Sequence, residues 1–159
     1  MAASEKMNYS GLDITNIGSI KKLEIQYFYP EKRKIDPSLP EQARRFLIQS
    51  QDSLHAPDGA VMLAAASIDA MFKQLGYVDG SLYKRIEKAV ADGKITSDMA
   101  KWAHQVRLDS NDPRHADLGS PPHTPSSARR AFDFALALAE VLYVLPQRVT
   151  RGIREGKQA

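Results

Sequence analysis

Cysteine is absent from this chain of 159 residues, and tryptophan occurs once. Without thiols the chain can form neither a disulfide nor a thiolate metal site. Its two most apolar runs, GAVMLAAASIDAMF and FDFALALAEVLYVL, are each interrupted by an acid and are shorter than the ~20 residues of a membrane span. The N-terminus also lacks the apolar core of a secretory signal. We therefore expect a cytoplasmic protein with no membrane association, no cofactor and no bound metal.

The charge balance is nearly even. The formal net charge is +3 and the isoelectric point is about 9.1. This mild excess permits an anionic partner without requiring one. Hydrophobic residues make up 43% of the chain. Both this composition and the length are typical of one globular domain with one core.

Most of the chain has the hydrophobic period of helices, and we predict an all-α bundle of about five helices. We divide the chain into an N-terminal arm (1–37), a helical domain (38–153) and a basic tail (154–159). The arm contains IKKLEIQYFYP, whose partly alternating apolar residues indicate a possible β-strand at about 20–29.

Local signals predict where the helices begin and end. Ser81 and Thr124 are expected N-caps, the latter followed by a proline at the first helical position. Gly76 is expected to end the second helix in the left-handed conformation. Pro146 should kink or end the last helix. In the fourth helix, we expect Trp102 to face the core together with Met99, Ala103 and Val106.

The stretch WAHQVRLDSNDPRHAD contains the residues that point to chemistry. His104, Arg107 and Asn111 share one face of the predicted fourth helix. Arg114 and His115 follow in the turn that Pro113 interrupts. An imidazole can transfer protons near neutral pH, and a guanidinium can bind a phosphate through two hydrogen bonds. This combination suits RNA cleavage without a metal ion.

A structural interpretation of the same residues is equally simple. Arg and Asn side chains at a helix C-terminus commonly bind the carbonyl oxygens of the last turn, which have no partner within the helix. A histidine in a loop is usually solvated. From spacing alone, both interpretations stay open.

The sequence from PDGAVMLAAASIDAMF through ITSDMAKWAHQVRLDSNDPRHAD resembles a bacterial family of unknown function that is also found attached to restriction-endonuclease subunits. That family is grouped with the HEPN (higher eukaryotes and prokaryotes nucleotide-binding) superfamily. The resemblance covers about residues 38–153. Arg107, Asn111 and His115 match the family's pattern of an Arg at a helix end followed by an Asn and a His.

The resemblance implies a HEPN-like helical bundle, frequent homodimers, and in many members metal-independent ribonuclease activity in toxin–antitoxin or phage-defence systems. It implies Arg107, Asn111 and His115 as candidate catalytic residues. His104, on the same helix face as Arg107, and Arg114, directly before His115, are supporting candidates from their positions. The seven residues LDSNDPR that separate the Arg from the His form a longer spacer than in the ribonuclease members. This departure favours a non-catalytic module.

Asp69 is a further supporting candidate. Superfamily members often carry an acid on this helix that orients the arginine. The simpler alternative is an ion pair between Asp69 and Lys73, one helical turn apart on the surface.

Three functions follow as hypotheses. The first is a non-catalytic HEPN-like module that binds a partner protein, a nucleotide or a nucleic acid such as RNA, in a defence or restriction context. The second is a metal-independent endoribonuclease whose Arg/His site lies at a homodimer interface. The third is a purely structural homodimer subunit. We expect dimer contacts at the helix 132–145 and at the KKLEIQYFY segment.

Overall fold

The computed structural model describes residues 32–111 and 121–157, and within these ranges it contains helices and no strand. The predicted all-α class is therefore confirmed. The expected strand at 20–29 and the site residues Arg114 and His115 lie outside the described residues. The chain separates into two units, residues 1–33 and 34–159. The second unit holds the helical bundle.

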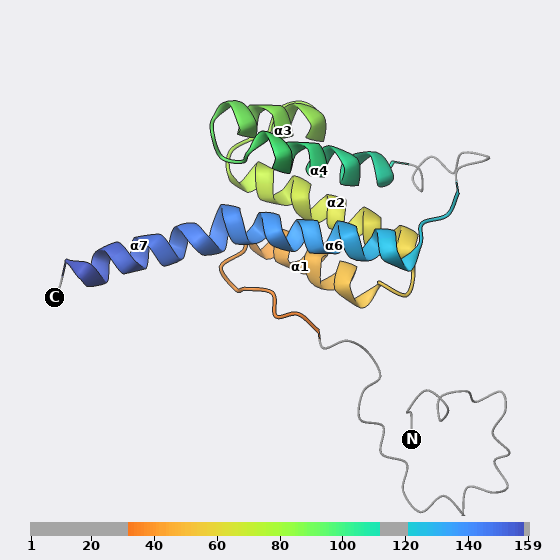
Figure 1. The fold of residues 1–159 in the computed structure, drawn as a ribbon, viewed down its shortest axis with the longest axis horizontal. Coiled ribbons are helices and arrows are strands. Elements are labelled where there is room, and N and C mark those ends of the chain that lie inside the picture. Colours follow the sequence, from red (N-terminus) through yellow and green to blue (C-terminus); the bar gives the residue numbers. More distant parts are fainter. Residues whose placement is uncertain (1–31, 112–120, 158–159) are drawn as a thin grey trace, which may run out of the picture. The chain divides into compact units, whose positions relative to one another are not determined.

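Five helical segments form the described bundle (Figure 1). Four are separate helices: α1 (Glu41–Asp52), α2 (Pro57–Gln74), α3 (Leu82–Ala91) and α4 (Ser97–Asp109). The fifth is continuous and consists of α6 (Pro125–Ala139), a π-helical turn η4 (Glu140–Val144) and α7 (Leu145–Gly156).

Helix α2 is the centre of the bundle, because it contacts α1, α3, α4 and α6. Its buried face contains four alanines, Ala60, Ala64, Ala65 and Ala70, so neighbouring helices can approach closely. Two buried serines fasten α1 to α2: Ser67 donates to the carbonyl oxygen of Ala43, and Ser50 donates to that of Ala60, each at 2.8 Å. The largest side chains of the core are Phe72, Phe132 and Phe134.

The predicted helix boundaries are largely confirmed. The Ser81 side chain accepts from the backbone N–H of Lys84, and Thr124 forms a reciprocal capping box with Ser127. Gly76 follows α2 with φ +95°, and Gly93 follows α3 with φ +67°. These are left-handed conformations that glycine adopts without steric cost.

Two predictions about side chains and breaks differ from the structure. Trp102 is 43% exposed, because the buried stripe of α4 is formed by Ala100, Ala103 and Val106. Its ring nevertheless packs on Phe134, with centroids 4.6 Å apart. Of the two outcomes expected at Pro146, an end of the helix is wrong: the helix continues past it to Gly156, so residues 154–156 of the expected basic tail are helical.

The π-helical turn η4 explains how the helix accommodates Pro146. In a regular α-helix the proline ring clashes with the carbonyl group four residues earlier. Here the chain widens just before the proline, and the N–H of Leu145 donates to Glu140, five residues back. The helix therefore changes its hydrogen-bonding pattern where proline supplies no donor.

Candidate functional site

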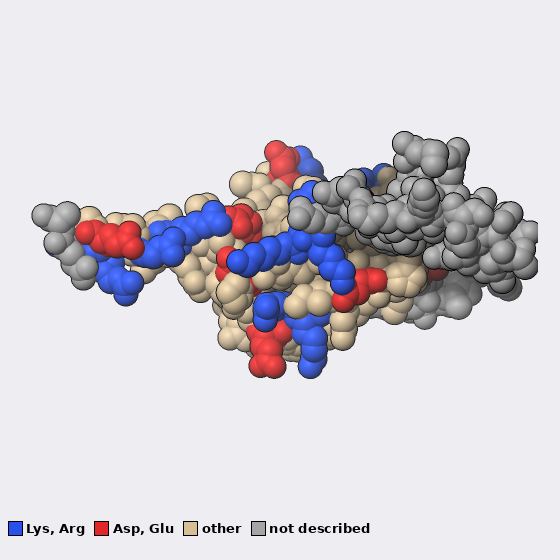
Figure 2. Space-filling model, turned by 90° about the horizontal axis from the view of Figure 1, so that it is seen from below, with Lys and Arg blue, Asp and Glu red and all other residues tan. Residues whose placement is uncertain are grey.

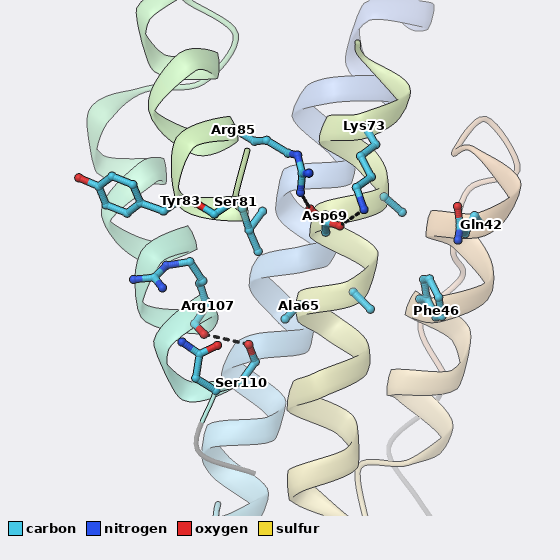
Figure 3. A pocket seen from close by; sticks show the side chains of 14 residues that line it. Gln42, Phe46, Ala65, Asp69, Lys73, Ser81, Tyr83, Arg85, Arg107 and Ser110 are labelled. Atoms are coloured by element: carbon cyan, nitrogen blue, oxygen red, sulfur yellow. Dashed lines mark hydrogen bonds and ion pairs between the residues drawn. The ribbon is translucent and has the colours of Figure 1, made fainter. Parts of the chain in front are cut away.

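A cleft of about 500 Å³ lies where α1, α2, α3 and the end of α4 meet (Figure 3). This volume is within the usual range of small-molecule sites. Its lining contains three cations, Lys73, Arg85 and Arg107, against a single carboxylate, that of Asp69. Arg107, Asn111 and Asp69, which the sequence singled out, all line it. The cleft therefore brings these three residues into one cationic site.

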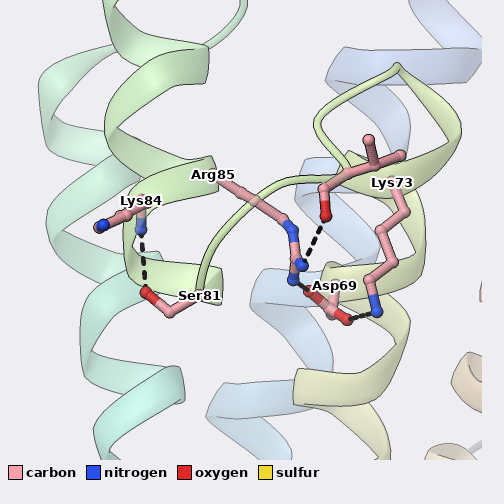
Figure 4. Close-up of polar contacts among 6 residues, drawn as sticks. Asp69, Lys73, Ser81, Lys84 and Arg85 are labelled. Atoms are coloured by element: carbon pink, nitrogen blue, oxygen red, sulfur yellow. Dashed lines mark hydrogen bonds and ion pairs between the residues drawn. The ribbon is translucent and has the colours of Figure 1, made fainter.

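Two of the three cations, Lys73 and Arg85, share the single carboxylate of Asp69 as their counter-charge (Figure 4). Lys73 Nζ lies 2.6 Å from one carboxylate oxygen of Asp69, which confirms the ion pair along α2. Arg85 Nη1 donates to the other oxygen, and Arg85 Nη2 donates to the carbonyl oxygen of Val78 at 3.0 Å. Asp69 thus joins α2 to α3. It binds Arg85 in place of Arg107, the arginine that the family resemblance implied.

Arg107 has a different environment. Its guanidinium carbon lies 5.6 Å from the centre of the Tyr83 ring, a cation–π contact. In Figure 3 it lies on the Tyr83 side of the cleft, across from Asp69. The buried Nε of Arg107 makes no hydrogen bond with any described residue. Arg107 is therefore the cleft cation that has no counter-charge among the described residues.

The carbonyl oxygens at the end of α4 are satisfied by other residues. Ser110 Oγ donates to the carbonyl oxygen of Arg107 at 2.8 Å. His123 Nε2 lies 2.7 Å from the carbonyl oxygen of Asp109, which can only accept. The side chains of Arg107 and Asn111 make no such bond in the described structure. Ser110 and His123 thus bind the carbonyl oxygens at this helix end, which is the role that the structural interpretation gave to Arg107 and Asn111.

His104 lies beside the cleft and does not line it. Its ring stacks on Tyr83 with centroids 4.7 Å apart, and its Nε2 lies 2.7 Å from a carboxylate oxygen of Glu87. Tyr83 is therefore in contact with His104 and with Arg107. His104 therefore packs against Tyr83, one of the aromatic residues that line the cleft.

Helix α3 supplies site residues that the sequence did not single out: Ser81, Tyr83 and Arg85. The first turn of α3 lines the cleft. The first N–H groups of a helix have no acceptor within the helix. The sequence signal was weak, because the polar positions of α3 read as an ordinary solvated face. The only available indication was the N-cap at Ser81, which places the positive end of a helix at that point.

The site has no evident metal ligands. Across residues 32–111 and 121–157, no three acidic or histidine side chains are grouped to hold a metal ion.

In those same ranges, no helix combines the length and the apolar character that crossing a membrane requires.

A family model described as a domain of unknown function, DUF4145, matches residues 42–156. The chain belongs to this family. The matched range runs from α1 to the end of α7, so it includes the whole cleft and the C-terminal helix. Searches of the curated proteins and of the solved structures gave no significant match.

Proposed function

We propose that this member of the DUF4145 family is a non-catalytic, HEPN-like module that binds a nucleotide, free or within a nucleic-acid strand. The phosphate group of the nucleotide binds in the cleft, next to Arg107. The observation that carries the proposal is Arg107, a cation held on Tyr83 whose buried Nε has no acceptor in the described structure. A phosphate oxygen supplies the missing acceptor.

Charge and shape support this ligand class. The cleft residues have an excess of positive charge, since only Asp69 opposes three cations. The start of α3, at Ser81, Leu82 and Tyr83, lines the cleft and brings the positive end of a helix dipole to it. The amides of Gln42 and Asn111 and the rings of Phe46 and Tyr83 lie in the same lining. Amides and aromatic rings are the groups that bind bases and riboses.

The defence or restriction context rests on the sequence resemblance alone. The non-catalytic assignment rests on the long spacer between Arg107 and His115. A partner protein with an acidic surface would bind Arg107 in the same way, so the test uses defined ligands, a nucleotide and an RNA.

The test measures binding of a fluorescent adenosine nucleotide and of a fluorescent single-stranded RNA to the full chain. Arg107→Ala should weaken binding roughly tenfold, because a hydrogen bond to a charged group is lost. Arg130→Ala is the matched control, since it removes an equal charge from an exposed position of α6 that does not line the cleft. Affinity should also fall as salt rises, and more steeply for RNA than for the nucleotide.

The outcomes are distinct. Equal affinity in the wild type and Arg107→Ala would refute the proposal, as would the absence of binding to either ligand. The same RNA, incubated without divalent metal, tests the alternative of a metal-independent endoribonuclease. Cleavage by the wild type that both Arg107→Ala and His115→Ala abolish would show that the module is catalytic.

A further inference from the structure

A second hollow, of about 680 Å³, lies between the connector that precedes α1 and the C-terminal helix α7, which projects from the bundle (Figure 1). The connector contributes Asp36 and Ser38 to its lining. Helix α7 contributes three arginines, Arg148, Arg151 and Arg154. None of these residues lines the cleft beside Arg107, so the hollow is a separate site. We refer to it as the basic hollow.

Positive charge predominates in the lining of the basic hollow. Asp36 is the only carboxylate among its described residues, against three guanidinium groups. This carboxylate already accepts a hydrogen bond from the backbone N–H of Ser38 at 2.9 Å. Figure 2 shows Lys and Arg side chains along the projecting α7 and on the face of the bundle beside it.

The arginines of the hollow are only weakly paired with acids. Arg148 lies 2.9 Å from Glu140, and Arg151 lies 4.0 Å from Glu155. All four side chains are about half exposed or more, and exposed ion pairs are weak. Arg154 forms no ion pair with another described residue. An anion of higher charge can therefore compete for these arginines.

The three arginines are distributed along the helix. Residues 148–154 cover about 9 Å of helix axis at about 1.5 Å per residue. A stacked nucleic-acid strand carries one phosphate per about 3.4 Å, so this length corresponds to about two or three consecutive phosphates. A guanidinium group binds phosphate oxygens through two parallel hydrogen bonds. The row of arginines is therefore suited to a chain of phosphates.

The basic hollow and the cleft offer different groups to a ligand. The cleft contains the rings of Phe46 and Tyr83 and the amides of Gln42 and Asn111, which can bind a base. The described lining of the hollow contains no aromatic ring. Contacts to phosphates position a strand, whereas contacts to bases read its sequence. The hollow can therefore hold a nucleic-acid backbone without regard to its sequence.

The chain itself limits the distance between the two sites. Ser38 lines the basic hollow, and Gln42 lines the cleft. Four residues span at most about 14 Å even when they are fully extended. A strand that places one nucleotide in the cleft can therefore reach the hollow with its neighbouring phosphates.

We infer that the basic hollow is a second anion-binding site, and that it binds the backbone phosphates of a single-stranded nucleic acid whose neighbouring nucleotide lies in the cleft. This inference rests on the proposed binding of a nucleotide beside Arg107. It also distinguishes the two forms of that ligand, because a free nucleotide occupies the cleft alone and a strand occupies both sites.

An anionic membrane is a less suitable partner for this surface. A helix that lies on a membrane inserts its apolar side chains between the lipids. The apolar stripe of α7 consists of the exposed residues Leu145, Val149 and Ile153. At about 100° per residue, Arg151 and Arg154 lie about 160° and 140° around the helix from Val149. Insertion of the stripe would therefore turn the basic hollow away from the lipid headgroups.

The inference is tested by the binding of a short fluorescent single-stranded RNA and of a fluorescent adenosine nucleotide to the full chain. The double variant Arg151→Gln/Arg154→Gln should weaken RNA binding at least about tenfold. It should also lower the slope of log affinity against log salt by about 1.4, because each phosphate contact to a single strand contributes about 0.7. Its affinity for the nucleotide should stay within about twofold of the wild type.

The matched control is Lys94→Gln/Arg130→Gln, which removes the same charge from exposed positions that line neither site. Glutamine forms helices nearly as well as arginine, so α7 should keep its helical content, measured by circular dichroism. RNA binding that the α7 variant leaves unchanged, or that the control weakens equally, would refute the inference. So would a wild type that binds the nucleotide but no RNA. Failure of the proposed function gives a different result, in which Arg107→Ala leaves nucleotide binding unchanged.

A series of RNA lengths gives an independent measurement. Wild-type affinity should rise as the strand lengthens until it reaches both sites, because the second contact is then intramolecular. The α7 variant should lose most of this rise, and an undiminished rise would contradict the inference. Vesicles that contain phosphatidylglycerol offer anionic groups without RNA. Vesicle binding that the α7 variant abolishes, together with unchanged RNA binding, would assign the surface to a membrane and overturn the inference.

Discussion

The cleft and the C-terminal helix α7 are two parts of one bundle that are built in opposite ways. In the cleft, four helices converge, and polar groups are held by one another, as Asp69 is held by Lys73 and Arg85. In α7, a single helix exposes Leu145, Val149 and Ile153 to solvent, with no described residue covering them. The cleft therefore pairs most of its charges within the bundle, whereas α7 leaves apolar side chains uncovered.

The comparison also distinguishes the residues that stabilise the fold from those that the fold exposes to solvent. The large buried side chains of α2 and α6, among them Phe72, Phe132 and Phe134, stabilise the fold strongly, because each removes a large apolar area from water. Helix α7 has no buried side chain and contributes little for the same reason. Substitutions in the two regions should therefore differ strongly in their effect on unfolding.

The largest effect is expected in the core. Phe72→Ala removes a fully buried ring of α2 and should lower the free energy of unfolding by about 3–5 kcal/mol, because a cavity remains. Ile153→Ala in α7 should change it by less than about 0.5 kcal/mol, because Ile153 is 58% exposed. Urea unfolding measures both values. Similar losses for the two variants would mean that α7 packs on its own bundle.

A smaller effect is expected at the ion-paired wall of the cleft. Asp69→Asn leaves the mostly buried Arg85, whose side chain is 10% exposed, without its carboxylate. We expect a loss of about 2 kcal/mol in the free energy of unfolding. The control is Asp98→Asn, whose partner Lys101 is 78% exposed and whose loss should stay below about 1 kcal/mol.

The same variant sharpens the functional assignment of the cleft. Asp69→Asn frees Lys73 and Arg85 from their shared counter-charge, so phosphate binding should become tighter although the fold becomes less stable. Weaker binding in a chain that is still folded would show that Asp69 itself contacts the ligand.

The smallest effect is expected at η4, between α6 and α7. Tyr143, in η4, donates its hydroxyl to the carbonyl oxygen of Met71 at 2.6 Å. Burial raises the pKa of Tyr143 to about 12, above its ordinary value of 10.0. Because the folded state holds this proton more tightly, the associated stability is complete below pH 10 and is lost as pH rises towards 12.

Tyr143→Phe tests this contribution. The variant should lose about 1 kcal/mol at neutral pH through the missing hydrogen bond. Its free energy of unfolding should then fall less steeply than that of the wild type above pH 10. Unfolding measured by denaturant at several pH values gives both slopes, and identical slopes would exclude Tyr143 as their source.

The ends of the helices were largely predictable from the sequence, because they depend on neighbours in the chain. Ser81, Thr124 and Gly76 act through hydrogen bonds or steric freedom within a few residues. The effect of Pro146 was not predictable in this way. Whether a helix ends at a proline or passes it depends on whether the preceding turn can widen, and in η4 it does.

The candidate site was predictable only in part. Arg107, Asn111 and Asp69 were identified from their positions on two helices, and the structure places all three in one cleft. Their contacts were not foreseen. Asp69 binds Arg85 from α3, and Arg107 lies on Tyr83 from the same helix. Both contacts depend on the rotation and offset of α3 relative to α2 and α4.

By itself, the sequence determined the helical class, the capped helix ends and the polar residues of the candidate site. These follow from the hydrophobic period and from interactions between neighbours in the chain. The tertiary structure decided which charges neutralise one another, why Trp102 is left partly exposed, and that α7 projects with its apolar stripe uncovered. The physical reason is that charge pairing and burial act between helices. Their strength is set by distances that no single helix specifies.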